Sequence, residues 1–140
     1  MKIFGIGTDI VRISRIKKSL KKELFVERLF NKKEILKCNK IKNSENCFAK
    51  RFAAKEAFSK ALGTGIAKGI NFNEILVLNE KNGKPFIKLL NKTKKKVEEK
   101  VKKKKYRISL SLSDEKDYAV AFVTISIWIK KKLKKLFMKI

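Results

Sequence analysis

The sequence predicts one α+β domain in which an antiparallel β-sheet packs against a long central helix. The expected order of elements is one strand, a group of helices, two strands, one helix and two strands, which favours antiparallel pairs. The Asn-Gly pair at Asn82–Gly83 is a strong signal for a β-hairpin. A chain of 140 residues without a repeat or linker suits a single domain.

The first strand is expected from Lys2 to Ile13, where Ile, Val and Phe are frequent and two glycines allow close backbone approach. Asp9 interrupts its apolar pattern. A carboxylate between Ile6 and Ile10 costs free energy when it is buried, unless a cation or a metal ion pairs with it. An edge position facing water is the alternative.

Helices are expected next. Ser14 can cap a helix that runs through Leu20 and Leu24, and residues 25–38 form a further helix or two short ones. Residues 39–46 are polar and predict a loop.

The central helix is predicted to begin near Ser44 and to end at Leu62, because Gly63 suits a C-cap that needs positive φ. Phenylalanines and alanines at helical spacings supply its apolar surface. Glu56 lies among them with Lys60 four residues later, and the simplest interpretation is a surface ion pair.

The second half of the chain predicts a hairpin, a helix and a final strand pair, at 73–79 with 84–90, at 93–105, and at 107–113 with 118–129. Pro85 is tolerated at the start of its strand. The lysine-rich helix has only Val97 and Val101 as regular apolar contacts, so it should lie on the surface. The continuous apolar run 118–129 indicates burial on both faces, and twelve residues are too few to span a membrane.

The predicted domain covers residues 1–129, and residues 130–140 form a lysine-rich extension. Leu133, Leu136 and Phe137 are spaced as one helical face with lysines around it. A basic amphipathic helix of this kind can lie on a membrane surface. A solvated extension is the alternative, and we expect no stable membrane insertion.

The formal net charge is +25, from 38 Lys+Arg against 13 Asp+Glu. Such an excess suggests a non-catalytic protein that binds a polyanion or a membrane surface. The basic residues are almost all lysine, however, and Ile, Asn and Phe are also abundant. These residues share A- and T-rich codons, so a biased base composition explains the charge without a nucleic-acid partner.

Cys38 and Cys47 are the only cysteines, and the chain has no histidine to complete a zinc site with them. The N-terminus enters an apolar strand without the pattern of a cleavable signal. We therefore expect reduced thiols in a cytoplasmic protein.

Asp9 and Glu56 suggest a metal site if the fold brings them together. Two carboxylates on separate rigid elements suit Mg²⁺, which completes its shell with water and substrate phosphates. The cations and the glycine turn of the central helix can hold a phosphorylated ligand, namely Lys50, Arg51, Lys55, Lys60 and Gly63-Thr64-Gly65. The chain has neither a P-loop nor a Rossmann fingerprint.

Several contiguous motifs stand out along the chain: Gly5-Ile-Gly-Thr-Asp-Ile-Val11 with Arg15-Ile16, Arg51-Phe-Ala-Ala-Lys-Glu-Ala-Phe-Ser-Lys-Ala-Leu-Gly-Thr-Gly65, Asn82-Gly-Lys-Pro85, Leu112-Ser-Asp-Glu115 and Tyr118-Ala-Val-Ala121. These motifs resemble those of the bacterial holo-[acyl-carrier-protein] synthases, the short trimeric type of the 4'-phosphopantetheinyl transferase superfamily. The resemblance covers about residues 2–126 in the family's order.

The resemblance implies Mg²⁺-dependent transfer of the 4'-phosphopantetheine arm from coenzyme A to a serine of acyl carrier protein, a step that supports fatty acid biosynthesis. Asp9 and Glu56 match the metal-binding acids. Lys60 matches a residue that contacts the pyrophosphate or helps to deprotonate the serine. Arg51, Lys60, Gly63, Thr64, Lys84 and Pro85 match coenzyme A contacts, and Arg15 matches a contact to the carrier's acidic helix.

One departure from the family concerns Ser109, which stands where the family usually has a histidine. A serine cannot act as a base near neutral pH, so a metal-bound water or Lys60 would have to take over any role of the imidazole. The resemblance also implies a homotrimer with active sites between subunits.

Overall fold

The computed structural model describes residues 1–64 and 69–130. Its elements are β1 (Lys2–Arg12), α1 (Ile13–Ser19), α2 (Glu23–Leu29), α3 (Lys32–Asn39), α4 (Ser44–Leu62), the 3-10 turn η1 (Phe72–Glu74), β2 (Ile75–Asn79), β3 (Pro85–Leu89), α5 (Asn91–Lys100), β4 (Tyr106–Asp114) and β5 (Tyr118–Ile127). The extension 131–140 and Gly65 lie outside the described residues.

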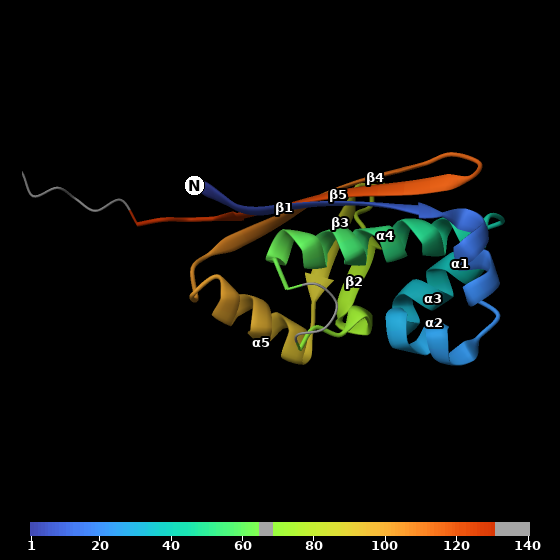
Figure 1. Ribbon diagram of the computed structural model, residues 1–140, viewed down its shortest axis with the longest axis horizontal. Helices are drawn as coiled ribbons and strands as arrows, with labels where there is room; N and C mark the ends of the chain where they lie inside the picture. The colour runs from blue at the N-terminus through green and yellow to red at the C-terminus, as the bar shows by residue number, and fades with distance from the viewer. Residues whose placement is uncertain (65–68, 131–140) are drawn as a thin grey trace, which may run out of the picture.

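Three strands form an antiparallel sheet in the order β1-β5-β4, and β2 and β3 pair as a separate hairpin. Helix α4 runs along one face of the sheet, with α1 to α3 below one end and α5 below the other (Figure 1). The predicted α+β class and the long central helix are confirmed.

Helix α4 lies unusually close to β1 because two glycines of the strand face it. A Cβ atom at Gly5 would lie 1.8 Å from the carbonyl oxygen of Ala61, and one at Gly7 would lie 1.9 Å from that of Ala57. Backbone therefore meets backbone at this contact, which only glycine permits.

The two faces of the sheet differ in burial. Residues of β5 alternate, with Ala121 and Val123 fully buried against α4 while Phe122 between them is 45% exposed. Ile6 and Ile10 of β1 share this outer face and are 60% and 64% exposed. The expectation that 118–129 is buried on both faces is therefore wrong for a single chain.

Lys55, at the centre of α4, forms a buried ion pair with Glu34 of α3. Its Nζ donates to Glu34 Oε1 and to the carbonyl oxygen of Leu29, both at 2.6 Å, and to that of Phe72 at 2.9 Å. Both side chains of the pair are fully buried, and burial lowers the pKa of Lys55 to about 8. Lys55 is thus a structural residue, and the expectation that it helps to hold a phosphorylated ligand is wrong.

Local sequence signals predicted most of the helix boundaries to within a few residues. Gly63 caps α4 with φ of +81°, as predicted. Residues 25–38 form two short helices, but α1 starts one residue before Ser14, and its N-cap, Arg12, makes no side-chain capping bond. Helix α5 ends at Lys100, and the following Lys102 and Lys103 have positive φ.

Cys38 and Cys47 form a disulfide, with their Cα atoms 5.4 Å apart. The expectation of reduced thiols is wrong because the short turn between α3 and α4 folds the two helices against one another and brings both cysteines into the core.

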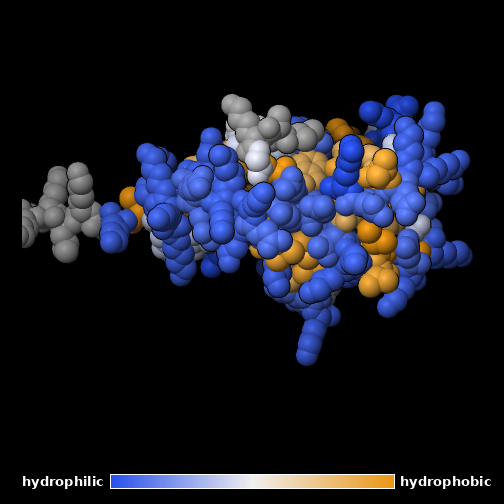
Figure 2. Space-filling model, turned by 90° about the horizontal axis from the view of Figure 1, so that it is seen from below, coloured by the Kyte–Doolittle hydropathy of each residue, from blue (hydrophilic) through white to orange (hydrophobic). Residues whose placement is uncertain are grey.

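The face of the molecule away from the sheet is divided by polarity. In Figure 2 the half over α5 is hydrophilic, and hydrophobic surface gathers towards the half formed by the first helices. Leu24 of α2 and Leu36 of α3, which are 66% and 62% exposed, belong to these helices. None of the helices within 1–64 and 69–130 is long and apolar enough to cross a membrane.

The contact between β1 and α4 can be tested by adding one methyl group. Gly7→Ala should destabilise the fold by about 3 kcal/mol or more, because a rigid backbone carbonyl cannot move aside as a side chain can. Urea unfolding followed by circular dichroism measures this change. Lys88→Ala, at an exposed position of β3, is the control and should unfold as the wild type does; equal midpoints for both variants would contradict the contact.

Candidate active site

Asp9 lies on the inner face of β1, two residues beyond Gly7. Strand side chains alternate, so Asp9 shares the face of Gly5 and Gly7 and points towards α4. Two strand residues advance about 6.7 Å and four helix residues about 6 Å, and the two elements run in opposite directions. Gly5 lies against Ala61 and Gly7 against Ala57, one turn earlier in α4. By the same step, Asp9 lies beside the turn of α4 that precedes Ala57.

Glu56 of α4 meets Asp9 in a cavity of about 370 Å³, which Arg15, Phe25 and Phe52 also line. Burial raises the pKa of Glu56, and the nearby charge of Asp9 raises it further. Burial also raises the pKa of Asp9, although a hydrogen bond and the charge from Lys60 partly oppose this. The two carboxylates converge within one chain, and the charge of Asp9 disfavours ionisation of Glu56.

Lys60 pairs with Asp9 and not with Glu56. Its Nζ lies 3.3 Å from Asp9 Oδ1 and donates to the carbonyl oxygen of Thr8 at 2.9 Å. Within the described part of the chain Glu56 forms no salt bridge, so the simple Glu56–Lys60 surface pair is wrong. The lysine brings one positive charge to the edge of the carboxylate pair.

The donor set fits a divalent cation. Two carboxylates with raised pKa values repel one another, and a hard cation held between them removes that repulsion. Among the described residues no third His, Cys, Asp or Glu joins a group of this kind. Asp9 and Glu56 would thus supply two ligands and leave the remaining positions to water and substrate, as Mg²⁺ prefers.

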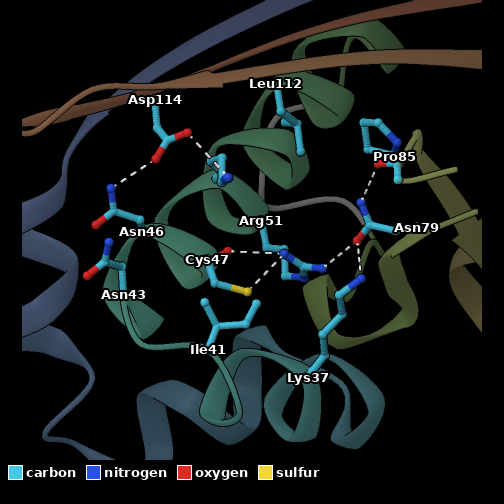
Figure 3. A pocket seen from close by; sticks show the side chains of 12 residues that line it. Lys37, Ile41, Asn43, Asn46, Cys47, Arg51, Asn79, Pro85, Leu112 and Asp114 are labelled. Atoms are coloured by element: carbon cyan, nitrogen blue, oxygen red, sulfur yellow. Dashed lines mark hydrogen bonds and ion pairs between the residues drawn. The ribbon is translucent and has the colours of Figure 1, made fainter.

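A second cavity, of about 450 Å³, is strongly basic (Figure 3). Arg51 NH2 and Lys37 Nζ both donate to Asn79 Oδ1, at 3.1 and 2.6 Å. Arg51 is 4% exposed, burial lowers its pKa, and its Nε has no hydrogen-bond partner within the described residues. Two cations around one neutral amide leave net positive charge, which suits a phosphate group.

Comparison with known proteins decides the family. The model of the 4'-phosphopantetheinyl transferase superfamily matches residues 5–123. The chain belongs to this superfamily. It is 50% identical over 125 residues to the holo-[acyl-carrier-protein] synthase of Pelagibacter ubique, across 89% of this chain and 98% of that protein.

Solved structures of superfamily members agree with the fold. The holo-[acyl-carrier-protein] synthase of Neisseria meningitidis matches with a TM-score of 0.80 and 40% identity, over 89% of this chain and 98% of that one. That of Bacillus anthracis, in complex with CoA (3',5'-ADP), matches with a TM-score of 0.76 and 35% identity, over 91% of this chain and 100% of that one.

The other residues predicted from the superfamily resemblance lie around these two cavities or at the end of α4. Pro85 lines the basic cavity, and Lys84 precedes it in the hairpin turn, exposed to solvent. Gly63 caps α4, and the hydroxyl of Thr64 beyond it is buried without a partner in the described part of the chain. Lys50, which the charge pattern and not the resemblance suggested as a cation for a phosphorylated ligand, also lines the basic cavity and pairs with Asp114 at 3.2 Å.

Sequence reasoning missed Lys37 and Asn79. Both contact the basic cavity from elements that the sequence placed correctly, α3 and β2. Neither belongs to a quoted superfamily motif, so only the packing of α3 and the hairpin against α4 reveals them.

The two cavities open on different sides of α4. Arg51 and Glu56 are five residues apart, which places their side chains about 140° apart around the helix axis at 3.6 residues per turn. Ser109 lies on a third side: it pairs with Thr124 on the outer face of the sheet, opposite to α4. In a single chain of this superfamily member, the carboxylate cavity, the basic cavity and Ser109 therefore do not form one site.

The raised pKa values of Asp9 and Glu56 predict that removing one of the two negative charges will stabilise the folded protein. A group whose pKa is raised in the folded state makes that state lose stability as pH rises from 4.5, the ordinary value for Glu56, through the raised value. We therefore expect Glu56→Gln to raise the thermal unfolding midpoint at pH 7 without divalent cations, and to leave it unchanged at pH 4.

Glu99→Gln, at an exposed position of α5, is the matched control and should not change the midpoint at either pH. A lower midpoint for Glu56→Gln at pH 7 would show that the Glu56 charge is stabilised in the folded protein, against this account.

Proposed function

We propose that the protein transfers 4'-phosphopantetheine from coenzyme A to a serine of acyl carrier protein in the cytoplasm, with Mg²⁺ bound by Asp9 and Glu56, and that this step supports fatty acid biosynthesis. The observation that carries the proposal is the convergence of these two acids in one cavity, from β1 and α4. The superfamily membership and the coenzyme A complexes of related synthases support the same reaction.

The basic cavity suits the nucleotide end of coenzyme A. Arg51 and Lys37 supply the charge for a phosphate group, and Asn79 and the backbone near Pro85 supply polar and apolar contacts. The buried Nε of Arg51, which has no partner within the described residues, is a further hydrogen-bonding group for this ligand.

The serine oxygen forms a bond to the phosphorus next to pantetheine, and the bond from that phosphorus to the oxygen of adenosine 3',5'-bisphosphate breaks. The serine hydroxyl proton passes to water or to the released phosphate group. The bound cation would neutralise charge on the pyrophosphate. Lys60 already donates to a carbonyl and a carboxylate, so its ammonium group has a third N–H for a phosphate oxygen. This arrangement favours the electrostatic role of Lys60 over that of a base.

A homotrimer with shared sites accounts for three separate features. The outer face of the sheet is apolar and exposed at Ile6, Ile10 and Phe122, as an interface between subunits would be. The two cavities lie on different sides of α4, so one coenzyme A reaches both only if they come from neighbouring subunits. Ser109 on the outer face would then approach a neighbour's site, with a hydroxyl in place of the family's imidazole.

The carrier protein would dock beside the carboxylate cavity. Arg15 lines that cavity, and Phe25 lines both it and an adjoining apolar hollow with Leu24 and Arg28 of α2. Exposed arginines beside apolar side chains suit an acidic amphipathic helix, because charge guides the encounter and apolar contact holds the complex. Residues 130–140 remain an extension outside the transferase domain in this proposal.

The reaction can be tested directly. Incubation with coenzyme A, Mg²⁺ and apo acyl carrier protein should add one phosphopantetheine to the carrier, as measured by intact mass spectrometry. Asp9→Ala and Glu56→Ala should each slow the transfer by at least about 100-fold, because each removes a ligand that stabilises developing charge. No adduct with the wild type would refute the function, and full activity of both variants would refute the metal site.

Sharing of sites between subunits can be tested by mixing inactive variants. Glu56→Gln disables the carboxylate cavity and Arg51→Gln the basic one, so a mixed trimer contains junctions where both cavities are intact. Random pairing makes about a quarter of all junctions intact, and co-expression should restore about that share of the wild-type rate. Glu56→Gln co-expressed with Asp9→Ala is the control, since both changes affect the same cavity. Activity no higher in the first mixture than in the control would mean that each chain forms its own site.

A further inference from the structure

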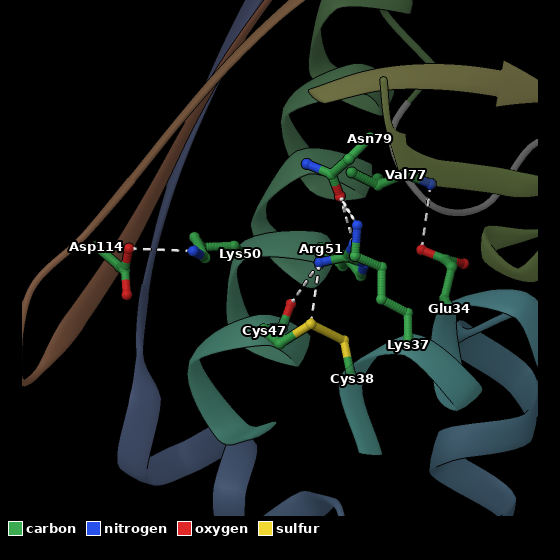
Figure 4. The surroundings of a disulfide bond; sticks show 9 residues. All are labelled: Glu34, Lys37, Cys38, Cys47, Lys50, Arg51, Val77, Asn79 and Asp114. Atoms are coloured by element: carbon green, nitrogen blue, oxygen red, sulfur yellow. Dashed lines mark hydrogen bonds and ion pairs between the residues drawn. A yellow bond between two sulfur atoms is a disulfide. The ribbon is translucent and has the colours of Figure 1, made fainter. Parts of the chain in front are cut away.

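The disulfide between Cys38 and Cys47 joins α3 to α4 at the wall of the basic cavity (Figure 4). Cys47 lines that cavity, whereas Cys38 is fully buried behind it. The bond therefore lies between the core and the site where we place the nucleotide.

Each cysteine is next to one of the two cations of the cavity: Cys47 by hydrogen bonds to Arg51, and Cys38 by its place after Lys37 in the chain. Arg51 NH1 donates to the carbonyl oxygen of Cys47 at 3.3 Å and to its Sγ at 3.1 Å. Lys37 directly precedes Cys38 in α3, and its Nζ meets Arg51 NH2 at the shared acceptor Asn79 Oδ1. The covalent bond thus fixes the element that carries Lys37 to the element that carries Arg51.

The two cations repel one another. Partial desolvation beside Arg51 lowers the pKa of the Lys37 ammonium group, and the charge of Arg51 lowers it further. Lys37 is itself exposed on a short helix, so without a covalent tie the repulsion favours its movement away from Arg51. The buried Glu34–Lys55 pair holds the first turn of α3 against α4, whereas the disulfide holds the last turn, which carries Lys37. The disulfide therefore opposes movement of this last turn and keeps both charges at the cavity before any ligand binds.

We propose that this disulfide is a redox-sensitive element that sets the affinity of the basic cavity for the phosphorylated nucleotide end of coenzyme A, high when the bond is closed and lower when a dithiol has opened it. This inference rests on the proposed function for the identity of the ligand. It adds regulation of the site through the position of Lys37.

Opening the bond follows ordinary thiol–disulfide exchange. A thiolate of the external dithiol attacks the Cys47 sulfur, which faces the cavity, and the Cys38 sulfur leaves as a thiolate. The second thiol of the reductant then displaces Cys47. The protein gains two electrons and two protons as two thiols, and the reductant becomes a disulfide. Disulfides of mesophilic cytosolic proteins are usually transient and redox-sensing, which agrees with this use.

Thermodynamic linkage gives the converse effect. If the closed form binds the nucleotide more tightly by some factor, the nucleotide must stabilise the closed bond by the same factor. A tenfold ratio of affinities corresponds to a reduction potential lower by about 30 mV for this two-electron couple. A bound nucleotide also covers the sulfur of Cys47 and should slow the attack.

The proposal is tested by titrating adenosine 3',5'-bisphosphate into the protein in a calorimeter. The oxidised protein, shown by thiol counting to have no free thiols, should bind about three- to tenfold more tightly than protein reduced with dithiothreitol, the effect of ordering one long side chain. Cys38→Ser should bind like the reduced protein with or without dithiothreitol, and circular dichroism should show that it remains folded.

Lys37→Ala separates the proposed route from a general loosening of the fold. Its oxidised and reduced forms should bind equally, both more weakly than the oxidised wild type. A redox effect that persists in Lys37→Ala would overturn the role of Lys37. Equal affinities of oxidised and reduced wild type, or a failure of the two cysteines to form the bond, would overturn the redox element while leaving the proposed function intact. No binding in either state would overturn both.

Discussion

The buried ion pair of Lys55 and Glu34 is the constraint on which the arrangement of the helices depends. Lys55 joins α4 to the end of α2 and to η1 through carbonyl oxygens, and Glu34 accepts from the backbone N–H of Val77 in β2 at 3.2 Å. Glu34 also closes the capping box at the start of α3. Breaking such a pair by removing one partner generally destabilises a protein by about 3–5 kcal/mol, since the other charge remains buried. One polar cluster therefore fixes the register of four elements against the central helix.

The same helix carries the chemistry on its other sides. Lys55 points into the core, while its neighbour Glu56 faces the carboxylate cavity and Arg51 faces the basic one. A helix held from the inside by a buried ion pair can present opposite charges to two separate cavities without rotating. The charges at these cavities are unfavourable on their own, as the shifted pKa values of Asp9, Glu56 and Lys37 indicate. Residual unfavourable charge of this kind is typical of sites whose ligands supply the opposite charge.

The sequence predicted those features that depend on local signals or on contiguous motifs. The bounds of α4, its glycine cap and the hairpin at Asn82–Gly83 follow from helix propensity and turn chemistry, and the pairing of Asp9 with Glu56 followed from two motifs read together. Features that depend on packing between distant segments had no such signal. The spacing of Cys38 and Cys47 is equally compatible with free thiols, and a lysine in a helix gives no sign that it will be buried. The exposed outer face of β5 could not be inferred either. A continuous apolar run has the same sequence pattern whether both of its faces pack in the core of the domain or one of them is left for another surface.

The contact of Gly5 and Gly7 with α4 has a consequence for how this protein can change in evolution. Because backbone atoms set the distance between β1 and α4, the gap between Asp9 and Glu56 does not depend on the sizes of the core side chains. Substitutions among the phenylalanines and aliphatic residues of the core would alter stability and leave the spacing of the two acids in place. A lineage under strong mutational bias can thus replace many apolar core and surface residues without changing this gap, provided that selection retains the two glycines, the two acids and the Lys55–Glu34 pair that holds α4.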